Sequence, residues 1–188
     1  MIAIDPGQSG GIAIQRTTVG VGTVEAVTMP KTEREIYEVI EGAQSTDVEG
    51  ATAYLETLVK FAGRNMPSSA MAVYASNYGF IKGVLTALKW RIVLVPPKEW
   101  QRKLNLGKAK GLTKTEWKNK LKQKAEELYP KLKITLATAD ALLILEAAKR
   151  GTNDSTMVSG ASLTLPVLKG SCVATADSSI LSNISDLP

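Results

Sequence analysis

The sequence contains no histidine and only one cysteine, Cys172. Because a disulfide needs two cysteines, the chain cannot form one internally, and a cysteine-based zinc site is excluded as well. The absence of histidine excludes a histidine-dependent catalytic triad and a histidine-ligated metal. Any metal must therefore be held by oxygen atoms, and any general base must be a carboxylate, a lysine or a metal-bound water.

Long apolar runs are also absent. The sequence has no stretch of 18 apolar residues, so we expect no membrane-spanning helix and no membrane partner. Asp5 interrupts the N-terminus before the apolar stretch of a signal peptide could form. We therefore expect a soluble protein of the cytoplasm.

The length of 188 residues suits one well-buried domain and is too short for two ordinary ones. The 23 Lys and Arg residues outnumber the 18 Asp and Glu residues, and the formal net charge is +5. This excess lies in residues 1–150, because residues 151–188 hold one lysine against three aspartates. A basic domain favours a polyanionic partner such as nucleic acid, although solubility alone also accounts for a positive charge.

The hydrophobic pattern predicts one α/β domain over residues 1–150 and a weakly ordered Ser/Thr/Gly-rich tail over residues 151–188. One added hairpin around residues 163–173 is the alternative for the tail. We expect strands at residues 1–5, 10–14, 21–29, 51–58 and 91–95. We expect helices at residues 32–42, 69–88, 98–104, 113–128 and 138–150, the fourth opened by a capping box of Thr113 and Glu116. The second is expected to carry one long apolar face, lined by Met71, Tyr74, Tyr78, Ile81 and Leu85. A three-strand meander followed by strands alternating with helices predicts a mixed sheet with helices on both faces.

Three carboxylates stand where apolar elements begin or end: Asp5, Glu56 and Asp140. An acid in such a place is poorly solvated and needs a partner, and three of them can share a divalent cation, since Mg²⁺ prefers oxygen ligands. Each acid also has a simpler explanation. Asp5 can form a turn before Pro6 and Gly7, Glu56 can be a surface acid at a strand end, and Asp140 can be a helix N-cap.

The segments around these acids resemble a known family. Residues 2–11, IAIDPGQSGG, resemble the first motif of RuvC-like Holliday junction resolvases, while YLE at residues 54–56 and ADALLI at residues 139–144 resemble the second and the last. NYGF at 77–80, VPPKEWQ at 95–101 and KGLTK at 110–114 look like segments of the phage-type branch. The resemblance covers roughly residues 1–150, and the order and spacing of the motifs are more specific than any one of them.

The resemblance implies an RNase H-like fold, a homodimer, and metal-dependent cleavage of four-way (Holliday) DNA junctions that leaves 5′-phosphate nicks. It implies two Mg²⁺ or Mn²⁺ ions per active site, about 4 Å apart, with Asp5, Glu56 and Asp140 as catalytic metal ligands. The host would be a bacterial or phage-infected cell, and the role would lie in DNA recombination and repair. The chain departs from the family pattern at Ala137, where many relatives carry a fourth acid or a histidine. Glu146, two helical turns after Asp140, is less suited to fill this place.

The stretch from Lys98 to Lys133 holds twelve basic residues against four glutamates. Lys114, Lys118 and Lys122 fall four residues apart and predict a basic ridge on one helix, suited to phosphate contacts; a solvated helix face is the alternative. By resemblance, the loop after Glu56 also approaches the junction. The expected DNA-binding residues are Lys60, Arg64, Lys103, Lys108, Lys110, Lys114, Lys118 and Lys122. Trp100 and Trp117 are expected to pack internally rather than to stack on bases.

Two other functions remain open from the sequence. Because Ala137 leaves the ligand set short, the chain could be a branched-DNA-binding protein of the same fold that does not cleave. An Asp-x-Gly turn also occurs in actin-like and sugar-kinase ATPases, but these need a second phosphate-binding motif and a second domain, for which the chain is too short.

Overall fold

The computed structural model describes residues 1–18, 21–44, 51–57 and 68–152. Contacts divide the chain into one unit over Met1–Met157 and a second over Val158–Pro188, and all described residues belong to the first. The predicted tail therefore lies outside the described residues, as do the basic residues Lys60 and Arg64.

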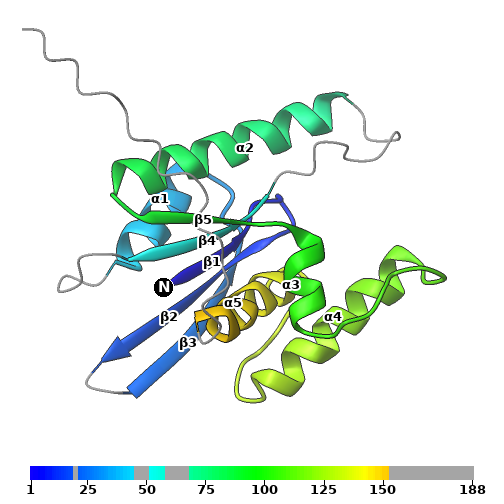
Figure 1. The fold of residues 1–188 in the computed structure, drawn as a ribbon. Coiled ribbons are helices and arrows are strands. Elements are labelled where there is room, and N and C mark those ends of the chain that lie inside the picture. Colours follow the sequence, from blue (N-terminus) through cyan, green and yellow to red (C-terminus); the bar gives the residue numbers. More distant parts are fainter. Residues whose placement is uncertain (19–20, 45–50, 58–67, 153–188) are drawn as a thin grey trace, which may run out of the picture. The chain divides into compact units, whose positions relative to one another are not determined.

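A mixed five-stranded sheet forms the centre of the domain (Figure 1). Its strands are β1 (Ile2–Asp5), β2 (Gly11–Thr18), β3 (Val21–Thr28), β4 (Thr52–Glu56) and β5 (Arg91–Val95), in the order β3-β2-β1-β4-β5. The pairs β1–β2 and β2–β3 are antiparallel, whereas β4 runs parallel to β1 and β5 parallel to β4. This arrangement confirms the predicted RNase H-like α/β fold class.

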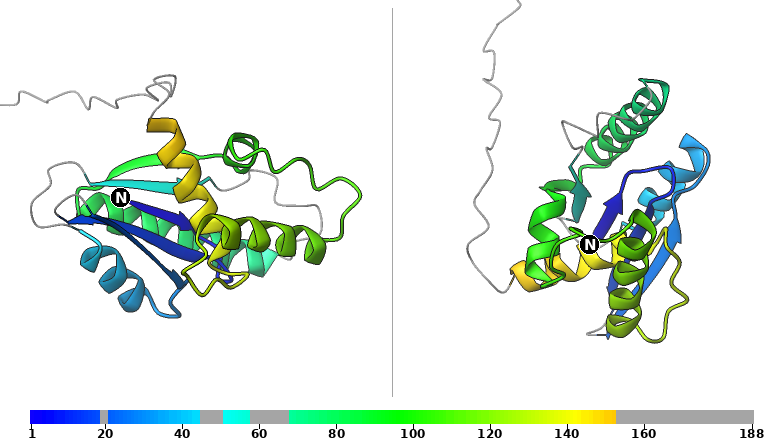
Figure 2. Two further views of the ribbon diagram at one scale, coloured as in Figure 1. Left: turned by 90° about the horizontal axis from the view of Figure 1, so that it is seen from below. Right: turned by 90° about the vertical axis from the view of Figure 1, so that its right-hand side faces the viewer.

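Helices cover both faces of the sheet (Figures 1 and 2). They are α1 (Glu33–Gly42), α2 (Ser68–Ala87), α3 (Pro97–Lys103), α4 (Lys114–Leu128) and α5 (Ala139–Thr152). The expected capping box at the start of α4 is present: the Thr113 hydroxyl accepts from the Glu116 backbone N–H, and the Glu116 carboxylate accepts from the Thr113 backbone N–H. Each expected helix and strand is present, with its ends shifted by a few residues.

Alternating side chains of the central strands build two separate cores. Ile2 and Ile4 of β1 point to one face, where they pack with the buried residues of α1 and α2. Ala3, between them, points to the other face, where it packs with α5, α4 and Trp100. Helix α5 is buried along most of its length, from Ala139 to Leu145, because it crosses β1 and β2 directly.

Helix α2 is buried only in its C-terminal half. Ile81, Val84 and Leu85 are inside the core, whereas Val73 is 45% exposed. The sequence pattern suggested one apolar face along the whole helix, but the first turns extend past the sheet and have no strand beneath them (Figures 1 and 2). This half of α2 therefore presents apolar side chains to solvent.

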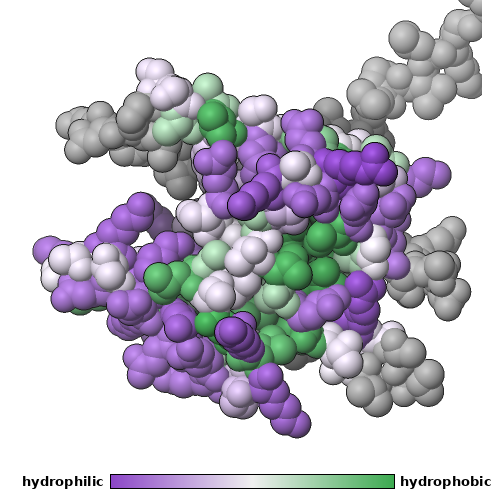
Figure 3. Space-filling view, turned by 180° about the vertical axis from the view of Figure 1, so that it is seen from behind, coloured by the Kyte–Doolittle hydropathy of each residue, from purple (hydrophilic) through white to green (hydrophobic). Residues whose placement is uncertain are grey.

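Apolar surface is also visible when the molecule is seen from behind, where it lies between hydrophilic regions (Figure 3). The large apolar side chains most exposed in the described residues are Tyr37, Val73, Leu94, Leu112 and Leu136. No helix within the described ranges is long and apolar enough to cross a membrane.

Candidate active site

The carboxyl ends of β1 and β4 place two of the three acids side by side. The parallel register pairs Ile4 with Leu55, so Asp5 and Glu56, the next residue of each strand, leave the sheet at the same edge. Parallel neighbours direct equivalent residues to the same face, which brings these two carboxylates toward one point. Both strands are almost fully buried up to these last residues.

The turn that follows Asp5 depends on a close approach of backbone at Gly10. A Cβ atom added there would lie 2.3 Å from the Asp5 carbonyl oxygen and 2.7 Å from its Cγ atom. The Gly7 backbone N–H donates to Asp5 Oδ1 over 3.3 Å, and Asn77 Nδ2 donates to the Pro6 carbonyl over 2.6 Å. Asp5 therefore makes the turn contact expected of an aspartate before Pro6 and Gly7. Its charge also interacts with those of Asp140 and Glu56.

Asp140 approaches Asp5 and Glu56 from helix α5, which packs on one face of the sheet. It is the second residue of α5, and the segment before this helix packs on β2, where a Cβ atom at Gly11 would lie 2.9 Å from the Ala137 carbonyl oxygen. Asp140 is only 7% exposed, and its Oδ2 atom lies 2.6 Å from Lys118 Nζ. Its Oδ1 atom is buried without a hydrogen-bond partner among the described residues. The carboxylate is thus not engaged in capping α5.

The acids perturb one another because they share this poorly solvated site. Burial, followed by the charge of Asp140, raises the pKa of Asp5 to about 6. Burial, followed by the charge of Asp5, raises the pKa of Glu56 to about 8, although the Trp100 indole N–H lowers it by donating to Glu56 Oε1 over 2.8 Å. Strongly perturbed acids clustered at strand ends are typical of functional sites.

Two further side chains belong to this centre. Burial lowers the pKa of the Lys118 amine, but the charges of Asp140, Asp5 and Glu56 raise it by more than burial lowers it. The pKa of Lys118 is therefore above its ordinary value. Burial, followed by the charges of Glu56 and Asp5, raises the pKa of Tyr74 to about 12. Lys118 is therefore a cation of the acidic centre, and Tyr74 is a neutral hydroxyl near it.

The sequence did not reveal the roles of Trp100 and Tyr74 at the site. Trp100 was expected in the core, which is correct, since it is 1% exposed. Its hydrogen bond to Glu56 spans 44 residues of sequence and had no signal in the local pattern. Tyr74 stood out only as one residue of an apolar helix face.

The predicted basic ridge of α4 is divided in the structure. Lys114 is exposed at the start of the helix, Lys118 turns into the acidic centre, and Lys122 lies 3.4 Å from Glu126. Lys108 and Lys110 are exposed in the loop before α4, and Lys103 is half-buried at the end of α3. Their contact with DNA stays a prediction. On α5, Glu146 bonds to Arg150 and Tyr129 and is not drawn to the acidic centre.

The candidate ligands at this centre are of the chemical type that a hard divalent cation prefers. All candidate ligands are carboxylate oxygens, and Asp140 Oδ1 is a buried acceptor with no donor in the described part of the chain. Within the same described ranges, however, no three acidic side chains are arranged to hold one ion. The centre instead contains one ammonium group, that of Lys118, paired with Asp140.

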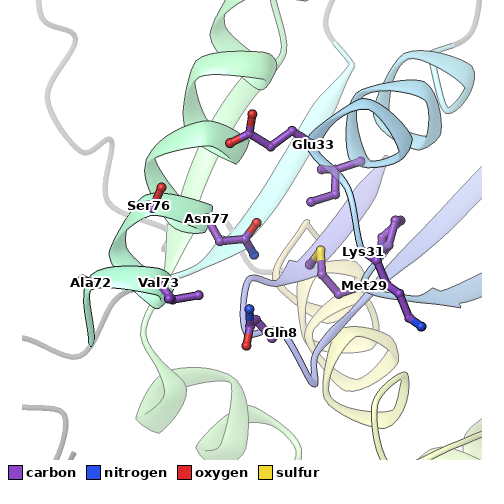
Figure 4. Close-up of a pocket in the computed structure, with 10 residues that line it drawn as sticks. Gln8, Met29, Lys31, Glu33, Ala72, Val73, Ser76 and Asn77 are labelled. Carbon is purple, nitrogen blue, oxygen red and sulfur yellow. The ribbon is translucent and has the colours of Figure 1, made fainter. Parts of the chain in front are cut away.

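An open groove of about 630 Å³ lies beside the turn that follows Asp5, between this turn, α1 and α2 (Figure 4). Helix α2 forms one wall, and the segment from the end of β3 into α1 forms the other. Its polar lining comes from Gln8, Lys31, Glu33, Ser76 and Asn77. The turn that carries Asp5 is thus reached from solvent on the α1–α2 side.

Comparison with known proteins gives a weak structural similarity. No protein-family model matches the chain, and no curated protein matches its sequence. The similar solved structures include the Thermus thermophilus RuvC structure and T. thermophilus RuvC in complex with Holliday junction substrate. Each has a TM-score of 0.47 and 15% sequence identity, and the alignment covers 81% of this chain and 98% of that chain. At this level the neighbours carry no argument about what this chain binds or cleaves, which has to come from its own residues.

Proposed function

We propose that the protein is a metal-dependent endonuclease that hydrolyses phosphodiesters of branched DNA, with the four-way junction as substrate. The observation that carries the proposal is the meeting of Asp5, Glu56 and Asp140 at the ends of two adjacent strands and the start of a helix. These three side chains, all in the described part of the chain, are not placed around one point in this structure, but buried carboxylates that repel one another favour a divalent cation. Their family-like motifs support the junction as substrate.

In this proposal Asp5, Glu56 and Asp140 together would hold two Mg²⁺ or Mn²⁺ ions through their carboxylate oxygens. The ions would supply a water of lowered pKa and stabilise the leaving 3′ oxygen, so the product carries a 5′ phosphate. Trp100 would orient Glu56 through its indole N–H. The buried Asp140 would keep one oxygen available for ligation.

Basic residues on α4 and in the loop before it support a DNA partner. Lys108 and Lys110 are exposed in the loop before α4, and Lys114 is exposed at the first residue of this helix. The same helix carries Lys118, which contacts Asp140. Lysine side chains in such a position suit the DNA backbone, where contacts fix orientation without reading sequence. We propose these residues, with Lys60, Arg64, Lys103, Lys118 and Lys122, as the DNA-binding set, and the cytoplasm of a bacterial or phage-infected cell as the location.

Cleavage of a synthetic mobile four-way junction tests the proposal. With Mg²⁺ or Mn²⁺, the wild-type protein should cut paired strands, and Asp5→Asn should reduce the rate more than about 100-fold, because a proposed metal ligand is lost. Asp5→Asn should still shift the junction in a gel. The matched control is Glu146→Gln, an acid of α5 outside the centre, which should cleave normally. A folded wild-type protein that leaves the junction uncut with either metal would contradict the proposal.

A second function is favoured by one observation, the ammonium group of Lys118 among the acids together with the missing acid at Ala137. A non-cleaving protein that binds branched DNA would need no metal and could keep this arrangement permanently. It would shift junctions with or without metal, and Asp5→Asn would change neither binding nor the absence of cutting. The same pair of assays therefore separates the two functions.

A further inference from the structure

The contact between Lys118 and Asp140 is the shortest ion pair of the described residues and has the least exposed acidic partner. The Nζ–Oδ2 distance is 2.6 Å, and the Asp140 side chain is 10% exposed, whereas the acidic partners of the two other pairs on α4 are about half exposed. Lys118 itself is partly buried, with 32% of its side chain exposed. A pair desolvated in this way is not a solvated surface contact.

The position of Lys118 sets its ammonium group against any divalent ion at the same carboxylates. Lys118 Nζ lies 2.6 Å from Asp140 Oδ2, and the charges of Asp5 and Glu56 also act on it, so its ammonium group belongs to the acidic centre. Two cations a few ångströms apart in a partly buried site repel strongly. An ion ligated by Asp140 would therefore have to displace Lys118 or bind against its repulsion.

We propose that Lys118 is the internal counterion of the acidic centre, which neutralises Asp140 in the metal-free protein and competes with the divalent ion for it. This inference rests on the proposed metal-dependent function and adds a control on metal loading. The ammonium group keeps the metal-free centre folded and weakens metal binding. When the ion is bound, Lys118 is released from Asp140 and its charge is available to an incoming phosphate.

Calorimetric titration with Mn²⁺, without DNA, tests the competition. Lys118→Met keeps the length of the side chain and removes its charge, so it should bind Mn²⁺ about tenfold more tightly than the wild type. Without metal the same variant should unfold at a lower temperature, because Asp140 is left buried and unpaired, and saturating Mn²⁺ should raise its melting temperature by more than that of the wild type. Lys118→Arg, which keeps the charge, should stay close to the wild type in both measurements.

The matched control is Lys124→Met, also on α4, which removes a lysine paired with the half-exposed Glu127. It should leave the Mn²⁺ affinity unchanged. Equal or weaker Mn²⁺ binding by Lys118→Met, with wild-type binding intact, overturns the competition and leaves the proposed function standing. If Lys118→Arg binds Mn²⁺ as tightly as Lys118→Met, and both bind it more tightly than the wild type, the competition is overturned as well. If neither the wild type nor Lys118→Met binds Mn²⁺, the metal-dependent function fails together with this inference.

Discussion

Glu56 shows, at the scale of single residues, that the acidic centre opposes folding when no metal is bound. Its pKa in the folded protein is about 8 against an ordinary value of 4.5, chiefly because of burial. The folded state thus prefers the protonated form, and the stability that this group contributes is complete below pH 4.5 and is lost as the pH rises through about 8. Asp5 acts in the same direction, over the range from 3.8 to about 6.

We therefore predict that Glu56→Gln stabilises the metal-free protein at pH 8.5. The amide cannot ionise, and its oxygen can still accept the hydrogen bond of Trp100. The gain over the wild type should be about 2 kcal/mol at pH 8.5 and should shrink toward zero near pH 5. Urea unfolding in the presence of a chelator at several pH values measures this difference.

The control for this prediction is Glu126→Gln on α4, where the carboxylate is half exposed and pairs with Lys122. Its effect on stability should be small and nearly constant between pH 5 and 8.5. A gain for Glu56→Gln that does not grow with pH would mean that Glu56 is better solvated than the structure indicates.

Residue-scale features of the site were predictable from the sequence only in part. Asp5, Glu56 and Asp140 could be identified because each adjoins a strong apolar pattern, which fixes its place at the end of an element. The contacts of Trp100 with Glu56 and of Lys118 with Asp140 could not, because they join side chains 44 and 22 positions apart whose meeting depends on how α3 and α4 pack. The even spacing of Lys114, Lys118 and Lys122 suggested one ridge, but packing of α4 on α5 turned the middle lysine inward.

At the scale of elements, the β1–β2 turn determines where Asp5 points. A Cβ atom at Gly10 would collide with the Asp5 carbonyl oxygen, the Asp5 Cγ atom and, at 2.9 Å, the Gly7 carbonyl oxygen. Two of these three atoms belong to backbone, so relief requires movement of the turn. We predict that Gly10→Ala lowers stability by about 2 kcal/mol or more and abolishes cleavage even when the protein stays folded. Thermal unfolding and the junction assay measure the two effects.

Gly83 offers the matched control, since it lies inside α2 with no atom within 4 Å of an added Cβ. Gly83→Ala should stabilise the protein by about 0.5–1 kcal/mol, because alanine loses less conformational entropy in a helix. Normal cleavage by a folded Gly10→Ala protein would show that the turn tolerates a side chain and does not set the position of Asp5.

The elements themselves were largely predictable because turns and caps interrupt the apolar pattern clearly. Pro30 and Thr32 separate β3 from α1, and Thr113 with Glu116 begins α4 as expected. Strand β2 is longer than expected, extending to Thr18, because pairing with β3 continues through Gln15 and Arg16, which carry no apolar signal. The partial burial of α2 was not predictable, since helical periodicity shows which face is apolar but not how far the sheet extends beneath it.

At the scale of the whole molecule, the exposed half of α2 is the surface that best suits the homodimer implied by the family resemblance. From Ser68 to Ile81 the helix contains no charged residue, and Val73 is 45% exposed. A charge-free helix face with an exposed valine can be buried against a second copy at little desolvation cost. A four-way junction has two scissile strands related by near two-fold symmetry, and a two-fold dimer would present one acidic centre to each.

We therefore propose this half of α2 as a dimer contact and predict that Val73→Glu leaves the protein monomeric at micromolar concentration, because a charge at a two-fold contact would be desolvated and would face its own copy. Analytical ultracentrifugation should give twice the chain mass of 20.1 kDa for the wild type and the single mass for the variant. The monomeric variant should still nick junctions but should lose the paired cuts that resolve them. Thr86→Glu, at an exposed position near the end of α2, serves as the control and should stay dimeric. A wild-type protein that is monomeric and yet cuts both strands in one encounter would remove the need for a dimer and would assign another role to the exposed half of α2.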